Sequence, residues 1–185
     1  MNTKTLQLAE IALFAALMAV LSQIAFPLGP IPFSCGVLGA LLCGLMLRPK
    51  SALLALLVYL LLGSVGLPVF AGFSGGLQKL AGMTGGYLIG YVLIAWITAL
   101  SVSFASSHPK LPRAAVILSA EVLGVLACYA LGTLWFLVLS GNSLAAALSA
   151  CVLPFLPGDA IKIILSYLLS AVLKKRLVHA GISLA

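Results

Sequence analysis

Long runs of apolar residues, separated by short segments rich in proline, glycine or basic residues, dominate the chain. A helix that crosses a membrane needs about 20 predominantly apolar residues. The runs predict six transmembrane helices, at residues 6–26, 34–47, 51–62, 83–104, 114–139 and 159–176. The second is short for a full span, so we expect it to be tilted or extended by the preceding loop. An apolar stretch at residues 144–152 predicts a short re-entrant helix.

The composition also indicates a membrane protein. Hydrophobic residues make up 63% of the 185 residues and charged residues 7%, values far from those of soluble domains. We therefore predict an all-α integral membrane protein in which residues 1–185 form a single transmembrane, substrate-binding domain within the lipid bilayer. The net charge of +7 would suggest nucleic acid in a soluble chain. Here the basic residues lie in short segments between apolar runs, so we expect no nucleic-acid partner.

The distribution of basic residues predicts the orientation. Six spans put both termini and the turns at residues 48–50 and 106–113 on one side of the membrane. By the positive-inside rule this side is cytoplasmic. It holds eight of the ten basic residues, namely Lys4, Arg48, Lys50, Lys110, Arg113, Lys174, Lys175 and Arg176. The other two, Lys79 and Lys162, fall on the external side, where the rule disfavours them.

Two connecting segments have compositions that disfavour a helix. Residues 26–33 contain three prolines and a glycine, which predict an extended, uncharged loop that could cover a pocket as a lid. Residues 63–86 hold eight glycines together with apolar side chains that a solvated linker would lack. Irregular backbone at membrane depth is tolerated where protein buries it or where it lines a cavity. We expect the second segment to help line a ligand site.

Asp159 and Lys162 stand three residues apart in an almost uncharged region, at the predicted start of the last helix. That spacing puts them on one helix face, with Asp159 as the expected N-cap. An intramembrane charge is a functional-site hypothesis by default. Asp159 can accept hydrogen bonds from a ligand, while Lys162 or Lys79 can donate to a carbonyl or neutralise a carboxylate. A purely structural ion pair is the alternative.

Aromatic residues predicted on the same side could enclose an apolar ligand body. Taken singly, each favours a role in packing or in an interfacial belt over one in ligand binding. They are Phe26, Phe33, Phe70, Phe73, Tyr87, Trp135 and Phe155.

Other polar residues suggest less. Glu121 lies inside the fifth predicted helix, either as a proton-relay group or, as we favour, as a structural carboxylate that snorkels toward or pairs with the basic end. The four cysteines form no C-x-x-C pair, and the two histidines fit no ligand spacing, so we expect no metal and no cofactor.

The first predicted helix carries two interleaved pairs of small residues, Ala12 with Ala16 and Ala15 with Ala19. Such pairs let another helix approach closely in lipid, which predicts a docking face for a partner. The alternative is that alanine is simply a good helix former.

One catalytic motif also matches. Residues 72–76 satisfy G-x-S-x-G, and the first four fit the G-x-S-G of rhomboid-type intramembrane serine proteases. A serine nucleophile needs a nearby base. His108 and His179 fall on the cytoplasmic side, about a bilayer thickness from Ser74, so we expect no enzyme. The chain also lacks the phosphate-binding motif of an ATPase.

Three stretches together resemble the BioY family, the biotin-binding S components of energy-coupling-factor (ECF) transporters, over nearly the whole chain. They are residues 66–72 (GLPVFAG), 84–91 (TGGYLIGY) and 154–162 (PFLPGDAIK). Family members often carry proline before the second motif, where this chain has Met83. The resemblance implies the six-helix S-component fold, external biotin capture in a prokaryotic plasma membrane, and assembly with a transmembrane coupling subunit and two cytoplasmic ATPases. It also implies that Ala12, Ala15, Ala16 and Ala19 dock on the coupling subunit.

Biotin matches the polar residues found above. Its ureido ring offers two N–H donors and a carbonyl, and its tail ends in a carboxylate. If the resemblance holds, Asp159 accepts from the ureido N–H groups, Lys162 and Gln78 complete the polar shell, and Lys79 is a candidate for the carboxylate. It also places Gly85, Tyr87, Phe33, Phe73 and Trp135 around the ligand. Another vitamin-binding S component is the main rival.

Overall fold

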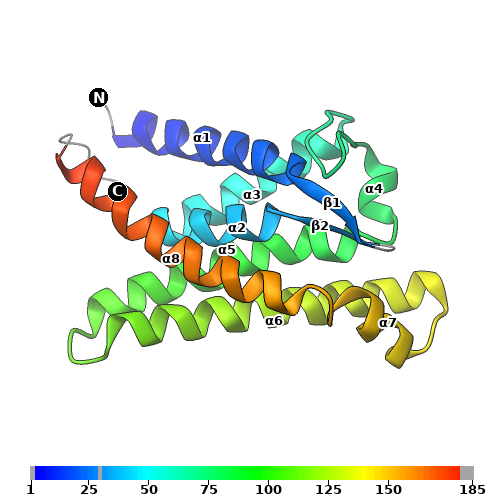
Figure 1. Cartoon of the computed structure of the whole chain (residues 1–185). Helices are drawn as coiled ribbons and strands as arrows, with labels where there is room; N and C mark the ends of the chain where they lie inside the picture. Colours follow the sequence, from blue (N-terminus) through cyan, green and yellow to red (C-terminus); the bar gives the residue numbers. More distant parts are fainter. Residues whose placement is uncertain (1–2, 29–30, 180–185) are drawn as a thin grey trace.

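A computed structural model describes residues 3–28 and 31–179 (Figure 1). The described part of the chain is predominantly helical, as predicted, with one small β-hairpin. In chain order its elements are α1 (Thr3–Gln23), β1 (Ala25–Leu28), β2 (Ile31–Ser34), α2 (Gly36–Met46), α3 (Pro49–Ser64), α4 (Leu77–Ala81), α5 (Gly85–Ser107), α6 (Arg113–Ser140), α7 (Leu144–Cys151) and α8 (Leu156–His179). The predicted short helix at residues 144–152 is present as α7.

Four of the described helices, α1, α5, α6 and α8, are long and apolar enough to cross a membrane. They run along the length of the molecule (Figure 1). The helices α2 and α3 are apolar but shorter, with 11 and 16 residues. The chain is therefore a multi-pass membrane protein.

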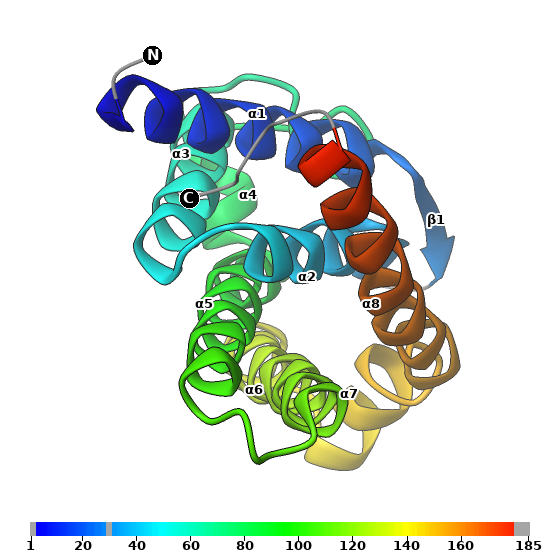
Figure 2. The ribbon, with the colours of Figure 1, turned by 90° about the vertical axis from the view of Figure 1, so that its left-hand side faces the viewer.

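The short helix α2 forms the centre of the bundle. All of its residues are buried, and in the end view of Figure 2 it lies between α1 and α3 on one side and α5 on the other, with α8 beside it. A Cβ atom at Gly44 would lie 2.5 Å from the carbonyl oxygen of Ala95 on α5. Only glycine allows this approach, and small residues at helix contacts are what hold helices together in lipid.

The helices α5 and α6 pack closely as neighbours in the same way. A Cβ atom at Gly90 would lie 2.5 Å from Cys128 Sγ, and one at Gly132 would lie 2.4 Å from the ring of Tyr87. Glycine on one helix thus receives a side chain of the other. As a result, Tyr87 is held at the contact between the two helices.

Of the predicted loop, residues 26–28 and 31–33 are extended, as predicted, and pair with each other; residues 29–30 lie outside the described residues. Strands β1 and β2 are antiparallel, with Phe26 opposite Phe33 and Pro27 opposite Pro32. Proline has no N–H to donate, so it is usually confined to edges of sheets. A two-stranded ribbon consists of edges only, and here the two prolines occupy the same rung.

The glycine-rich segment folds back over the end of α3. The ring of Phe70 lies against Gly63, where a Cβ atom would come within 2.0 Å of it. The N–H of Gly76 donates to the carbonyl of Gly63 at 2.7 Å. The one-turn helix α4 interrupts the segment, which the glycine content had concealed.

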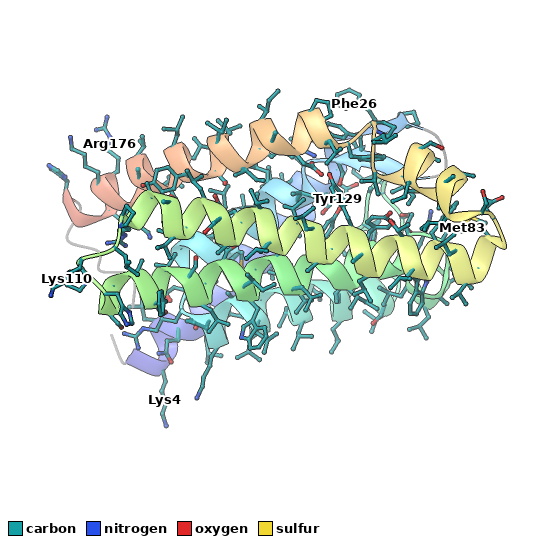
Figure 3. The ribbon with its side chains drawn as sticks, turned by 90° about the horizontal axis from the view of Figure 1, so that it is seen from below. Lys4, Phe26, Met83, Lys110, Tyr129 and Arg176 are labelled. Atoms are coloured by element: carbon teal, nitrogen blue, oxygen red, sulfur yellow. The ribbon has the colours of Figure 1, made fainter. Side chains whose placement is uncertain are left out.

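Basic residues gather at one end of the molecule, as the charge pattern predicts. In Figure 3, Lys4, Lys110 and Arg176 lie at the end opposite Phe26 and Met83. A groove of about 670 Å³ brings Arg48 and Lys50 beside Lys4.

Glu121 does not snorkel toward this basic end. It is fully buried in the bundle, and Ser166 of α8 is its hydrogen-bond partner. The expectation of a snorkelling or salt-bridged carboxylate is therefore wrong, because α8 covers this face of α6.

Candidate ligand-binding site

The first two turns of α8 carry Asp159 and Lys162. The helix begins at Leu156 rather than at Asp159, and the N–H of Asp159 donates to the carbonyl of Phe155 at 2.9 Å. The prediction that Asp159 is the N-cap is therefore wrong. Pro157 is tolerated because the first turn needs no N–H partner there. Asp159 still gains from its place near the positive end of the helix dipole.

The two charged groups form a buried ion pair. Lys162 Nζ lies 2.7 Å from Asp159 Oδ1, and the two residues are 6% and 3% exposed. Tyr129 of α6 donates to Asp159 Oδ2 at 2.5 Å, and Lys162 also donates to the carbonyl of Ser34 at 2.8 Å. Buried charges need this degree of pairing to be tolerated. The pair joins α8 to α6 and to the end of the hairpin.

The hairpin covers the ion pair through Phe33. Lys162 Nζ lies 3.6 Å from the centre of the Phe33 ring, a cation–π contact. The same ring lies 5.8 Å from that of Phe155 and rests on Gly158, where a Cβ atom would come within 2.4 Å of it. Glycine at 158 is thus what lets the hairpin lie against α8.

A cavity of about 30 Å³ lies beside the ion pair. Side chains of the hairpin and of α2, α5, α6, α7 and α8 line it together with the Val152–Phe155 connection. They are Ile31, Pro32, Ser34, Val37, Tyr87, Tyr91, Ile94, Val125, Cys128, Tyr129, Cys151, Phe155, Asp159 and Lys162. The wall is mostly apolar with a few converging polar groups, as in small-molecule sites.

A second cavity of about 120 Å³ continues from the first. The two share five lining residues: Ile31, Pro32, Ser34, Tyr87 and Tyr91. The second reaches the glycine-rich segment and α4 at Ser74 and Lys79, and Thr84 directly before α5. An elongated ligand would therefore have the ion pair at one end and the ammonium of Lys79 at the other.

Tyrosine hydroxyls line the wall between the two ends. Tyr87 shares a hydrogen bond of 2.9 Å with Thr133, and Tyr91 shares one of 3.3 Å with Ser34. Tyr91 and Tyr129 were missed from the sequence. The four-residue spacing of Tyr87 and Tyr91 puts them on one helix face, which was a usable signal. Nothing local pointed to Tyr129, because its partner lies 30 residues away.

Several predicted site residues do not line either cavity. Gln78 is exposed, and Phe73 is 74% exposed. Trp135 donates from Nε1 to the carbonyl of Gly82 at 3.0 Å, closing the turn before α5. At Gly85 a Cβ atom would lie 1.7 Å from the carbonyl oxygen of Leu80, so the close approach there is to backbone.

The small residues of α1 do not all face outward. Ala12 and Ala16 are exposed, and Ala19 is half-buried. Ala15 is 1% exposed and packs inside the bundle. The outward pair with helical spacing is therefore Ala12 and Ala16.

Ser74 has no catalytic base beside it. Its hydroxyl donates to the carbonyl of Ala71 at 2.9 Å. His108 stacks on Phe104 at the far end of α5, and His179 bonds to the carbonyl of Lys175 at the end of α8. Neither described histidine supports a serine nucleophile.

Comparison with known proteins supplies the family. A model of the BioY family matches residues 1–179. The chain is 38% identical to the biotin transporter BioY of Thermotoga maritima, over 91% of this chain and 96% of that protein. It is 36% identical to the probable biotin transporter BioY of Pyrococcus horikoshii, over 86% and 90%.

A solved structure shares the fold. The chain matches the crystal structure of the S-component for biotin from an ECF-type ABC transporter with a TM-score of 0.85 and 27% sequence identity. The match covers 95% of each chain. These proteins are transporters, which leaves no support for the protease alternative.

Proposed function

The chain belongs to the BioY family, and we propose that it is a biotin-binding S component that captures the vitamin for uptake by an ECF-type transporter. The observation that carries this proposal is the buried Asp159–Lys162 pair at the end of an elongated, mostly apolar cavity. The pair presents a carboxylate acceptor and an ammonium donor side by side, which is what a ureido group with N–H and carbonyl needs.

In the proposed binding mode, the ureido ring of biotin lies at the ion pair. Asp159 accepts from the ureido N–H groups and Lys162 donates to the ureido carbonyl. The apolar ring system packs among the aromatic side chains, and the tail runs through the second cavity to Lys79, which also lines it. Phe33 supports Lys162 from beneath rather than touching the ligand. Gln78, Gly85, Phe73 and Trp135 then serve the loops around the site.

Access requires the hairpin to move. A cavity of about 30 Å³ holds about one or two waters, which is far less than biotin occupies. The hairpin lines the cavity with strands of only four residues each, and Phe33 and Ser34 connect it to the ion pair. We expect it to lift for entry and to close over the bound vitamin together with the glycine-rich segment.

The partners follow from the proposed role. The exposed Ala12 and Ala16 of α1 form the docking face for a transmembrane coupling subunit, to which two cytoplasmic ATPases supply the energy. The chain itself has no phosphate-binding motif.

The membrane topology is part of the proposal. The chain forms one domain in the plasma membrane of a prokaryote, with α2 and α3 completing six spans. The basic end, with both termini, is cytoplasmic. The ion pair then lies toward the external side.

A binding measurement tests the function. Purified full-length protein is titrated with biotin, with riboflavin and thiamine as controls, by isothermal calorimetry. We expect saturable binding of biotin alone. Binding of another vitamin in place of biotin would assign the chain to a different substrate and contradict the proposal.

A further inference from the structure

A fully buried carboxyl group lies between α6 and α8, outside the ligand site. Glu121 is fully buried and is eight residues from Tyr129 along α6, or about 12 Å nearer the basic end at the helical rise. Its Oε2 atom has no hydrogen-bond partner among the described residues. An ionised carboxylate in that position would be strongly unfavourable.

The hydrogen bonds of Ser166 indicate that the carboxyl group of Glu121 carries a proton. Its Oγ lies 2.9 Å from Glu121 Oε1 and 2.8 Å from the carbonyl oxygen of Ile163. A serine hydroxyl has one hydrogen. It can donate to one of these oxygens, and the other short contact needs a hydrogen from elsewhere. A carbonyl has none to give, whereas a protonated Glu121 can supply it.

We propose that Glu121 is a proton-binding site that keeps its proton inside the folded protein. The protonated carboxyl group donates a hydrogen bond to Ser166 and so fastens α8 to α6 beneath the ligand-binding pair. The resulting chain runs from Glu121 to Ser166 to the carbonyl of Ile163, each donor meeting one acceptor. A neutral acid also removes the uncompensated charge.

The surrounding helices offer no cation to replace the proton. The helix α5 contains no charged residue, α7 none, and the central α2 none. On α8, Lys162 is engaged by Asp159 and Ser34, and Lys174 is two turns further along. On α6 itself, Arg113 is the first residue of the helix, about two turns before Glu121.

Loss of the proton has a definite structural result. When base takes it, the O–H bond of Glu121 breaks and the electron pair stays on the carboxylate. The one hydrogen of Ser166 can then serve Glu121 or Ile163, but not both. One bond between or within the helices is lost, and a net negative charge remains buried. Stability therefore falls as the pH rises. If the proposed function holds, alignment of Asp159 with Tyr129 weakens as well.

Infrared spectroscopy of the ligand-free, full-length protein tests the proton directly. The chain has three acidic residues, so Glu10→Gln, Glu121→Gln and Asp159→Asn can be compared one by one. We expect a carbonyl stretch of a protonated, buried carboxyl group near neutral pH that Glu121→Gln removes and the other two variants keep. Absence of that band, or its loss with Glu10 or Asp159 instead, contradicts the proposal.

Thermal unfolding across pH gives a second readout. The midpoint of the wild type should fall between mildly acidic and alkaline pH, while Glu121→Gln, with the same shape and an N–H donor, should lack that component. Ser166→Ala should destabilise the protein, whereas Ser101→Ala, which removes a buried hydroxyl that bonds within its own helix, should not. Identical pH profiles for wild type and Glu121→Gln overturn the idea. A sodium-dependent shift of the unfolding midpoint that Glu121→Gln abolishes would also overturn it, since the site would then bind a cation instead of a proton.

The inference and the proposed function fail separately. Both measurements above use protein without biotin, so an error about the substrate leaves them unchanged. In a parallel titration we expect Glu121→Gln to bind biotin within about twofold of the wild type, because the amide preserves the link to Ser166.

Discussion

Each oxygen of the Asp159 carboxylate has its own partner, an ammonium on Oδ1 and a phenol on Oδ2. These contacts point the carboxylate into the cavity and compensate for its burial. A ligand with N–H groups must compete with Lys162 and Tyr129 for the same lone pairs. Asp159 and Lys162 thus pair with each other in the absence of ligand, and the ureido group is proposed to replace that pairing with its own hydrogen bonds.

Asp159→Asn tests this competition. It keeps the shape of the side chain but loses the charge-assisted hydrogen bond, worth about 1.5 to 3 kcal/mol. The Kd for biotin should rise by about tenfold or more in calorimetric titration. Tyr167→Phe, on the same helix but outside both cavities, is the control and should bind as the wild type does. An unchanged Kd for Asp159→Asn would remove Asp159 from the proposed site.

The hairpin is the element whose contacts suggest movement. Its two central aromatic residues face each other across the strands. Phe33 reaches Lys162, Phe155 and Gly158, whereas Phe26 is 61% exposed. The residue on β2 therefore fixes the hairpin to α8, and the one on β1 does not.

Phe33→Ala should loosen this cover. Losing the ring removes a cation–π contact of about 0.5 to 2 kcal/mol and the packing around it, so the dissociation rate of biotin should rise by about tenfold. Phe26→Ala, directly opposite, should change it little. Stopped-flow displacement of labelled biotin measures both rates. Equal rates for the two variants would argue against the hairpin as the cover.

The helix α1 presents a surface rather than a site. Ala12 and Ala16 are exposed, while Ala15 is packed inside. Of the four alanines predicted to dock, only this exposed pair can meet a partner helix closely.

Ala16→Phe should separate uptake from binding. The bulky ring prevents close approach of the coupling subunit, so biotin uptake by cells that express the whole transporter should be lost while the Kd of the purified chain stays unchanged. Ala145→Phe, at an exposed alanine of α7, is the matched control and should transport normally. Persistent uptake in Ala16→Phe would show that docking uses another face.

For the whole molecule, the charge distribution is the property that decides orientation. Lys4, Lys110 and Arg176 lie at one end, and the described hairpin and the turn at Met83 lie at the other (Figure 3). Translocation disfavours basic segments, so the end rich in lysine and arginine is expected to remain in the cytoplasm.

Cysteine labelling in intact cells tests that orientation. Asn142→Cys, between α6 and α7, should react with a membrane-impermeant thiol reagent, and Lys110→Cys only after permeabilisation. The unsubstituted chain provides the background, with Cys43, Cys128 and Cys151 buried and Cys35 half-buried. The reverse labelling pattern would invert the proposed topology.

The sequence by itself determined the class of fold and the location of the charged pair. Apolar runs and basic turns act through length and charge, which are local properties of the chain. The spacing of Asp159 and Lys162 is local too, since any helix puts such residues on one face. The three short motifs added the family.

Only the tertiary structure decided which side chains meet. Residue composition does not encode that Pro157 sits inside the first turn of α8, that two prolines pair across a hairpin, or that Tyr129 reaches Asp159. Likewise, the spacing of the alanines does not reveal that Ala15 is buried inside the bundle. Contacts between segments far apart in the chain fix these features. Which face of a helix is buried depends on the shape of the neighbouring helices, and the sequence of that helix alone does not specify those neighbours.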